Sequence, residues 1–317
     1  MASSHYLSGT RLFVSPEGLS TALVKERQER KGSILIMTND IVASEIDKHY
    51  NDLNGFYQFA NCGVQGRIQE YMDKNLQSET AKACGLNIPI TQTVDDKFDY
   101  RSVAYPCVVK PKMSIRGGKN IEICENEEVL RSAIVTYDNA SDVLVQQKIN
   151  KEKEIVLVGC SINGEVIIPA IVDKHRENKG GTTYATVRPI TDQESDLVVK
   201  CKNLVNVIHY EGLFGIEFMK QEDLYYFTEM NLRTDATTYG VTVSGANLPL
   251  AYACNEACVG MVSPINMIVE WKDLKNVLSG RVSLLKWFRE MKNAACKYYY
   301  SNKDIKPFFM FLIKRLH

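Results

Sequence analysis

Two neighbouring β-rich segments carry acidic and amide side chains in an alternating pattern. Glu217 lies in the run Leu213–Met219, and Glu229 lies in the run Leu224–Met230, with Asn231 directly after it. A three-residue loop between the runs would place Glu217 diagonal to Glu229, at about 7–8 Å, whereas a two-residue turn would put the two carboxylates on opposite faces. Oxygens at that separation can bind a hard cation such as Mg²⁺, which takes few carboxylates and completes its shell with water and phosphate oxygens. The pattern therefore indicates metal-assisted phosphate chemistry, and the alternative is a half-exposed hairpin with solvated acids.

A lysine and a glycine-containing turn lie upstream of these acids in the sequence. The apolar run Cys107–Lys110 is typical of a strand that ends on a lysine, and the Gly-containing turn Ser114–Lys119 follows it. Glycine lets backbone N–H groups approach a phosphate closely. Lys110 taken alone could equally be a structural lysine whose stem covers apolar neighbours. Two widespread phosphate motifs are absent from the sequence, the Gly-x-x-x-x-Gly-Lys-[Ser/Thr] loop and the strand-linked Gly-x-Gly-x-x-Gly.

The elements that must position these residues are mostly antiparallel. Asn163–Gly164 joins the β-rich runs Glu154–Ile162 and Glu165–Asp173. Asn-Gly is the strongest short hairpin signal, because both central residues of a type I′ turn need positive φ. The runs that carry Glu217 and Glu229 predict a second hairpin. Helical patterns cover residues 73–84, 127–137, 193–210 and 247–259. Paired antiparallel strands among helices predict an α+β protein and not a βαβ alternation.

Composition narrows the class of protein. The chain has 317 residues, of which 45% are hydrophobic and 24% charged, so it can form a packed core in roughly two domains or lobes. Lys+Arg and Asp+Glu are equal at 38 each, which argues against a nucleic-acid partner for the whole molecule. No apolar stretch approaches the about 20 residues that span a bilayer, and no secretory pattern opens the chain. The nine cysteines include no Cys-x-x-Cys pair, so we expect a cytoplasmic protein without a zinc ribbon or disulfide scaffold.

The net charge of the whole chain is zero, but its C-terminal tail is basic. Residues 272–317 hold eleven Lys or Arg against three Asp or Glu, and they are rich in aromatic residues. Ser283–Met291 has the pattern of an amphipathic helix. Three interpretations remain open for this tail: packing against the body, contact with an anionic membrane surface, and contact with a partner or a second copy in a homodimer. The second interpretation would place the protein at the inner face of the membrane.

The chain resembles the ATP-grasp superfamily of carboxylate–amine and carboxylate–thiol ligases, and within it the D-aspartate ligases and carbamoyl-phosphate-synthetase-like proteins. The resemblance covers about residues 72–260 and rests on Glu217 followed by Glu229-x-Asn231-x-Arg233, on the strand that ends at Lys110, and on the glycine loop after it. Gly215 stands where some of these ligases carry a catalytic arginine, and Gln146–Gln147 stands where Glu-Glu is common.

The resemblance implies an ATP-grasp fold, in which two α+β lobes grip ATP. The implied organisation is a short N-terminal α/β region over residues 1–72, an ATP-grasp domain over 73–262 and a basic helical extension over 263–317. Within the ATP-grasp domain, the small lobe would cover about 105–147 and the large lobe about 148–262.

The resemblance also assigns roles to single residues. Glu217, Glu229 and Asn231 would bind Mg²⁺ or Mn²⁺. Arg233, Lys174 and Arg188 would be catalytic, the last two through the substrate carboxylate or acyl phosphate. The implied ATP contacts are the phosphate-binding Lys74 and Lys110, the loop residues Ser114, Gly117 and Gly118, the hinge residues Gln146, Gln147, Lys148 and Ile149, and the ribose contact Glu154.

The function that the resemblance implies is an ATP-dependent ligase for small molecules. It would convert a substrate carboxylate to an acyl phosphate and join it to an amine on an amino acid, another small molecule or a glycan. Two alternatives stay open: a nucleotide-binding regulatory module without turnover, and a bicarbonate-dependent carboxylase or carbamoyl-phosphate-type enzyme.

Overall fold

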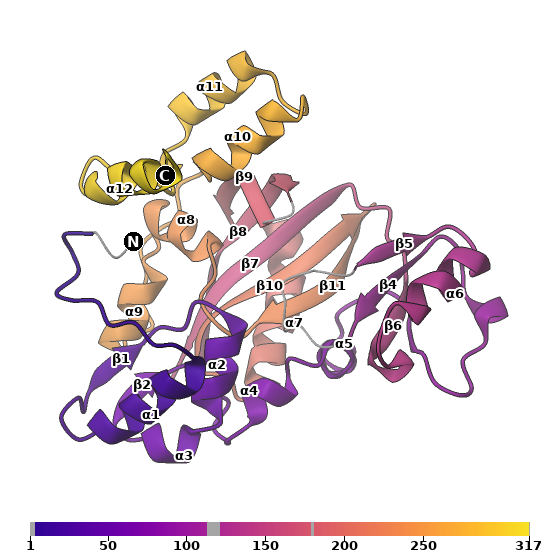
Figure 1. Ribbon diagram of the computed structural model, residues 1–317, viewed down its shortest axis with the longest axis horizontal. Coiled ribbons are helices and arrows are strands. Elements are labelled where there is room, and N and C mark those ends of the chain that lie inside the picture. Colours follow the sequence, from indigo (N-terminus) through magenta and orange to yellow (C-terminus); the bar gives the residue numbers. More distant parts are fainter. Residues whose placement is uncertain (1–3, 113–120, 179–180, 317) are drawn as a thin grey trace.

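The computed structural model describes residues 4–112, 121–178 and 181–316. Two separate sheets dominate the fold, one with four strands and one with seven, and a two-stranded parallel sheet lies near the N-terminus. In Figure 1 the seven-stranded sheet occupies the centre, the four-stranded sheet lies to the right, the N-terminal region lies below and the last three helices lie above. Both large sheets are built mainly from antiparallel pairs, which confirms the predicted α+β class.

The N-terminal region is a small α/β unit. Its two strands pair in parallel because helices connect them. Its elements are α1 (Pro16–Glu26), β1 (Ser33–Leu35), α2 (Asp40–Asp47), α3 (Tyr50–Leu53), β2 (Tyr57–Phe59) and α4 (Arg67–Glu70). Helix α5 (Lys74–Ala83) follows, with the Asp73 side chain accepting hydrogen bonds at its N-cap and Gly85 beyond its C-cap at φ 82°. The helix predicted at 73–84 is therefore confirmed.

The four-stranded sheet forms a small lobe around its own core. The strand order is β3-β6-β4-β5, and helix α6 packs on the sheet. Its elements are β3 (Thr91–Thr93), β4 (Cys107–Pro111), β5 (Glu122–Cys124), α6 (Glu127–Val135) and β6 (Val143–Gln147), with short 3₁₀ helices at Tyr100–Ser102 and Ala140–Asp142. The sequence predicted that this lobe begins at about residue 105. It begins earlier, because β3 pairs with β6.

The seven-stranded sheet forms the large lobe, in the order β11-β10-β7-β8-β9-β12-β13. Its strands are β7 (Lys153–Ile162), β8 (Glu165–Asn178), β9 (Gly181–Pro189), β10 (Gly212–Gln221), β11 (Leu224–Asn231), β12 (Ile265–Ile268) and β13 (Cys296–Lys297). Asn163 and Gly164 have φ of 52° and 78°, as the predicted turn between β7 and β8 requires. Strands β12 and β13 belong to this sheet, so the sheet does not end at the boundary predicted at residue 262.

Helices cover both faces of the large sheet. A 3₁₀ turn (Asp192–Glu194) leads into α7 (Ser195–Val207), which packs with the N-terminal region on one face. Helices α8 (Thr237–Val243) and α9 (Leu248–Cys254) pack on part of the other face. Helix α9 is shorter than the predicted 247–259, because Asn255 adopts the left-handed conformation at φ 57° and ends it. The remaining helices are α10 (Glu270–Leu278), α11 (Leu284–Asn293) and α12 (Lys306–Leu316).

Candidate active site

The β10–β11 hairpin places Glu217 directly opposite Glu229. Its turn has two residues, because Gln221 pairs with Leu224. The three-residue loop on which the diagonal arrangement depended is therefore wrong. A β-bulge restores the alignment: Phe218 pairs with Phe227 and Glu217 with Glu229, so Thr228 is the additional residue. One inserted residue reverses the alternation of side chains along a strand, and both carboxylates consequently lie on the same face.

Asn231 lies beside this carboxylate pair. Its Nδ2 donates to Glu217 Oε1 at 3.2 Å, and its Oδ1 accepts from Arg233 Nη2 at 3.2 Å. An amide oxygen has two lone pairs, so that oxygen can accept a further contact. The three predicted metal ligands therefore lie together at one edge of the large sheet.

Two lysines from outside the large sheet face Glu229. Lys74, the first residue of α5, has its Nζ 3.3 Å from Glu229 Oε2. Lys110, on β4 of the small lobe, donates to Gln146 Oε1 at 3.0 Å. Burial lowers the pKa of Lys110 to about 8, and the nearby charge of Lys74 adds to the decrease while Glu229 opposes it. The small lobe therefore holds a buried lysine, whose charged form is destabilised by burial, next to the acids of the large lobe.

Lys174 on β8 bridges two carboxylates of the large lobe. Its Nζ donates to Glu154 Oε1 and, at 2.7 Å, to Glu217 Oε2. Burial raises the pKa of the Glu217 carboxyl above its ordinary value although Lys174 opposes the increase, and the repulsion from Glu229 adds to it. Burial is also the largest influence on Glu229 and acts against its charge, but Lys74, Lys110 and Lys174 together outweigh burial, and the pKa of Glu229 lies below its usual range. The two acids therefore compete for the available positive charge, which is the electrostatic setting of a cation site.

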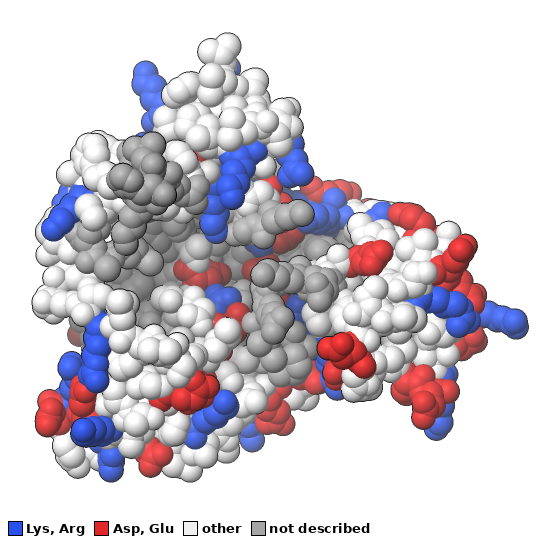
Figure 2. Space-filling view, in the orientation of Figure 1, with Lys and Arg blue, Asp and Glu red and all other residues white. Residues whose placement is uncertain are grey.

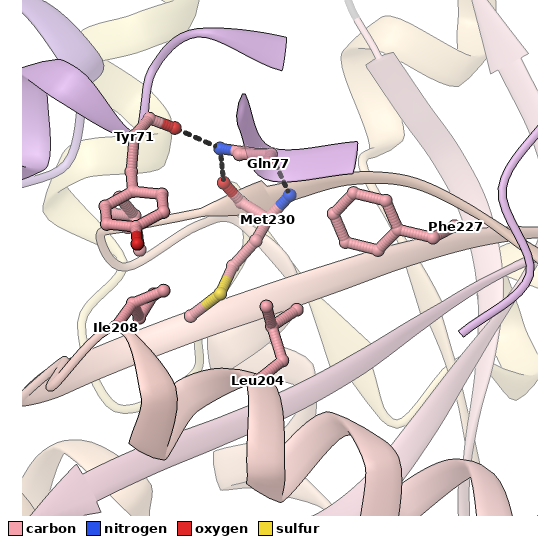
Figure 3. A pocket seen from close by; sticks show the side chains of 7 residues that line it. Tyr71, Gln77, Leu204, Ile208, Phe227 and Met230 are labelled. Atoms are coloured by element: carbon pink, nitrogen blue, oxygen red, sulfur yellow. Dashed lines mark hydrogen bonds between the residues drawn. The ribbon is translucent and has the colours of Figure 1, made fainter. Parts of the chain in front are cut away.

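Helix α5 is fixed to the strand that carries Glu229 and Asn231. Gln77 Nε2 donates to the carbonyl oxygens of Met230 (3.0 Å) and Tyr71 (2.6 Å), and the Met230 N–H donates to Gln77 Oε1 at 2.8 Å. Figure 3 shows this buried amide above the apolar side chains of Leu204, Ile208 and Phe227, around a void of only about 10 Å³. The space is too small for a substrate, so its packing and hydrogen bonds serve to hold Lys74 against Glu229.

Arg233 connects the site to the N-terminal region. Its Nε and Nη2 donate to the two oxygens of Asp40, the first residue of α2, at 2.7 and 3.2 Å. This fork-shaped pairing fixes the plane of the guanidinium group. Asp40 could not be predicted as part of the site, because no sequence pattern relates it to a residue 193 positions later.

The predicted hinge lies between the lobes, from the end of β6 to the start of β7. The backbone N–H of Gln147 donates to the carbonyl oxygen of Ile90 at 2.8 Å, and the Ile90 N–H donates to Gln147 Oε1 at 3.4 Å. Ile149 is buried. Gln146 is already engaged, because it accepts from Lys110 and its Nε2 donates to Thr91 Oγ1 at 2.8 Å. Its side chain therefore positions Lys110, and the adenine contact that the resemblance implied for Gln146 stays a prediction. The predicted loop residues Ser114, Gly117 and Gly118 lie outside the described residues.

The structure places Arg188 away from the other predicted catalytic residues. Arg188 pairs with Ile171 across β8 and β9, whereas Lys174 pairs with Ala185, so the two side chains point to opposite faces of the sheet. Arg188 binds Asp173 Oδ2 at 2.8 Å and Glu194 Oε1 at 2.7 Å on the α7 side. These contacts make it a structural cation, and the catalytic role predicted for it is not supported by its position.

We expect Arg188→Gln to lower stability and to leave nucleotide binding unchanged. The substitution removes the cation between two largely buried acids, and breaking such a pair costs about 3 kcal/mol. Urea unfolding and calorimetric ATP titration would measure the two effects, with the exposed Arg101→Gln as the control. Weaker ATP binding at unchanged stability would contradict this assignment.

The residues present fit a magnesium nucleotide. Among the described residues no cluster of three His, Cys, Asp or Glu side chains has the arrangement of a metal site. Glu217, Glu229 and Asn231 instead offer two carboxylates and one amide, as suits Mg²⁺ when phosphate and water complete its shell. A polar cleft of about 180 Å³ is lined by Glu154 and Lys174, among others, and Lys174 connects it to Glu217 at 2.7 Å. Gly215 leaves room for the nearby carboxylate of Asp235, since a Cβ on Gly215 would lie 2.8 Å from Asp235 Oδ2.

The family comparison agrees with this arrangement. A model of the ATP-grasp domain matches residues 79–249, more than half of the chain. The chain therefore belongs to the ATP-grasp family, and the predicted family and fold are confirmed. ATP-grasp enzymes use ATP and Mg²⁺, so the predicted cofactors are those of the family.

Solved structures with the same fold include three enzymes. N5-carboxyaminoimidazole synthetase from Staphylococcus aureus, complexed with ADP, has a TM-score of 0.66 at 18% identity, over 83% of this chain and 72% of that chain. The L-amino acid ligase from Bacillus licheniformis has a TM-score of 0.61 at 15% identity, over 82% and 68%. The biotin carboxylase domain of 2-oxoglutarate carboxylase from Hydrogenobacter thermophilus, complexed with MgADP, ADP and bicarbonate, has a TM-score of 0.64 at 17% identity, over 81% and 63%. At these identities the similarity shows the fold alone.

Proposed function

We propose that this protein is an ATP-dependent ligase that joins a substrate carboxylate to an amine. The observation that carries the proposal is the facing pair Glu217 and Glu229, with Lys74, Lys110 and Lys174 around it, where the small and large lobes meet. Acids of the large lobe meet lysines from α5, the small lobe and the large lobe there, and a triphosphate with its metal ion is a ligand that can use both charges.

The chemistry has two steps with a defined balance. A carboxylate oxygen of the substrate attacks the γ-phosphorus of ATP, the bond from that phosphorus to the bridging oxygen breaks, and ADP leaves. The amine nitrogen then attacks the acyl carbon, the carbon–oxygen bond to phosphate breaks, and the amide forms with loss of one proton. Such transfers depend mainly on positioning and on neutralising charge.

The side chains of this chain would supply both requirements. Glu217, Glu229 and Asn231 would hold Mg²⁺, which supplies charge neutralisation on the phosphate oxygens. Lys74 and Lys110 would neutralise phosphate from the α5 and small-lobe sides, and Arg233, oriented by Asp40, would bind the transferred phosphoryl group or the acyl phosphate. Lys174 would bind the substrate carboxylate after it exchanges one of its two present carboxylate partners.

The nucleotide base and ribose would lie at the hinge. Gln147, Lys148 and Ile149 connect the lobes there and would contact adenine through the backbone. Glu154, the second residue of β7, lies beside the polar cleft and would bind the ribose hydroxyls, in place of its present contact with Lys151 at 2.8 Å.

A substrate screen tests the proposal. The full chain with ATP and Mg²⁺ would be incubated with pooled carboxylic acids and pooled amines, and ADP release and new amide masses would be measured. We expect ADP formation that needs both pools, together with an amide product. ADP formation that needs only bicarbonate would replace the ligase with a carboxylase, and ATP binding without turnover in any pool would leave a regulatory module.

A further inference from the structure

The C-terminal helices expose a compact apolar surface. Four large hydrophobic side chains lie within residues 278–288, where α10 turns into α11, and we call this segment the hairpin tip. Their exposed fractions are 80% for Leu278, 52% for Leu284, 81% for Leu285 and 50% for Phe288. Figure 1 shows that the α10–α11 hairpin projects from the top of the molecule. Single exposed leucines are common, but a cluster of this kind marks an interaction site.

These side chains are not needed to hold α11 in place. The helix packs through Trp287, which is 7% exposed, against a small core that contains Ile268, Val282 and Ala294. Leu284, Leu285 and Phe288 therefore form a second apolar side of the same helix. Packing against the body, one of the three interpretations of the basic tail, accounts for Trp287 and for the strand pairing of β13, but not for the tip.

The tip is surrounded by positive charge. Arg281, Lys286, Arg289 and Lys292 are exposed within or directly after it. Among the described residues, Lys286 has one distant ion-pair contact, at 3.9 Å from Glu290 Oε1. Figure 2 shows blue side chains flanking the white surface of this upper part of the molecule.

The acidic residues of this part of the chain are occupied by internal contacts. Asp273 and Glu290 both bind Arg176 of β8, at 2.6 and 2.7 Å. Glu270 accepts the backbone N–H groups of Tyr298, Tyr299 and Tyr300. Asp304 contacts His5 at 3.0 Å. The acids therefore form contacts within the C-terminal helical region, whereas Arg281, Lys286, Arg289 and Lys292 are exposed on its surface.

We propose that the hairpin tip binds the surface of an anionic phospholipid bilayer. The tip is convex and carries flexible apolar side chains next to cations, so the leucines and Phe288 can enter the acyl region while Lys and Arg remain at the phosphate level. No helix of the described residues is long and apolar enough to cross a membrane, so the contact is peripheral. This inference does not depend on the ligase reaction.

Vesicle flotation provides a direct measurement. Vesicles of phosphatidylcholine with an equal amount of phosphatidylglycerol should carry the full chain upward in flotation. Pure phosphatidylcholine vesicles should do so at least about tenfold less, because each cation near an anionic surface strengthens binding about fivefold.

Matched variants separate the contribution of the apolar side chains to vesicle binding from that of the cations. Leu285→Ser with Phe288→Ser should weaken binding to the anionic vesicles at least about tenfold, and Val199→Ser with Val207→Ser, exposed on α7, should not. Lys286→Gln with Arg289→Gln should weaken binding about tenfold or more, and the exposed pair Lys82→Gln with Lys202→Gln should have little effect. Unchanged circular dichroism would show that the variants fold.

Three results would overturn the proposal. The first is equal binding to neutral and anionic vesicles, or binding to neither. The second is binding that the tip variants leave unchanged. The third is a dimer, detected by light scattering, that the tip variants convert to monomer without any effect on vesicle binding; the tip would then be an interface between two copies of the chain.

Discussion

Glu229→Gln should lower ATP turnover by about 10³-fold at saturating substrates. The amide keeps the shape of the side chain but removes the charge that would balance Mg²⁺ and the two lysines, and losing one preorganised charge contact of this kind costs about 10²–10³ in rate. ADP release measured over a range of Mg²⁺ concentrations should show both a lower maximum and a higher half-saturating Mg²⁺ concentration. Asp223→Asn, at the exposed end of the same hairpin, is the matched control and should leave turnover unchanged.

Glu229→Gln should also reduce stability. Adding Lys74→Met should separate the effect on stability from the effect on turnover. Lys74 is largely buried, and Glu229 Oε2 is 3.3 Å from it. Breaking the pair should lower the free energy of unfolding by about 3 kcal/mol. Adding Lys74→Met should restore most of the stability, because an apolar side chain can replace one partner of a broken buried ion pair, but it should not restore turnover. Recovery of turnover in the double variant would show that Glu229 acts only through folding.

Lys110→Met should abolish most ATP turnover and at the same time raise stability. Lys110 is 7% exposed, and burial together with the repulsion from Lys74 lowers its pKa to about 8. A change from 10.5 to about 8 corresponds to roughly 3 kcal/mol of unfavourable energy in the charged form. Methionine has no charge to desolvate, so we expect the free energy of unfolding at pH 7 to rise by about 1–3 kcal/mol.

The gain in stability from Lys110→Met should depend on pH. Below pH 8 Lys110 is protonated in both the folded and the unfolded chain, so the full cost of the buried charge is present. Between about pH 8 and 10.5 the unfolded chain holds a proton that the folded chain has lost, so the stability of the wild type rises with pH. The advantage of Lys110→Met should therefore be largest below pH 8 and disappear towards pH 10.5.

Urea unfolding across this pH range measures the effect. Lys97→Met, exposed in the same lobe, is the control and should show no such pH dependence. A variant with reduced stability and normal ADP release would show that Lys110 is a structural lysine, which was the alternative interpretation of the sequence.

Several parts of the fold depended on local signals and were therefore predictable. The Asn163–Gly164 turn, the β-rich runs beside it and the helix that begins at Lys74 are specified by residues within one turn or one strand. The residue types of Glu217, Glu229 and Asn231 on two adjacent strands also indicated metal-assisted phosphate chemistry, and the family resemblance added Arg233 to this set. In each of these cases the interacting groups are close in sequence, so propensity and periodicity contain the information.

The sequence alone thus determined several of the helices and hairpins and which side chains could bind a metal and phosphate. Only the tertiary structure decided how these side chains face one another. The bulge at Thr228, and not a longer loop, brings Glu217 opposite Glu229. The contact from Arg233 to Asp40 spans 193 positions of the chain. The side of the sheet on which Arg188 lies depends on the pairing register of β8 and β9. A shift of one residue moves a side chain to the other face of a sheet, and packing and pairing between distant segments fix that register.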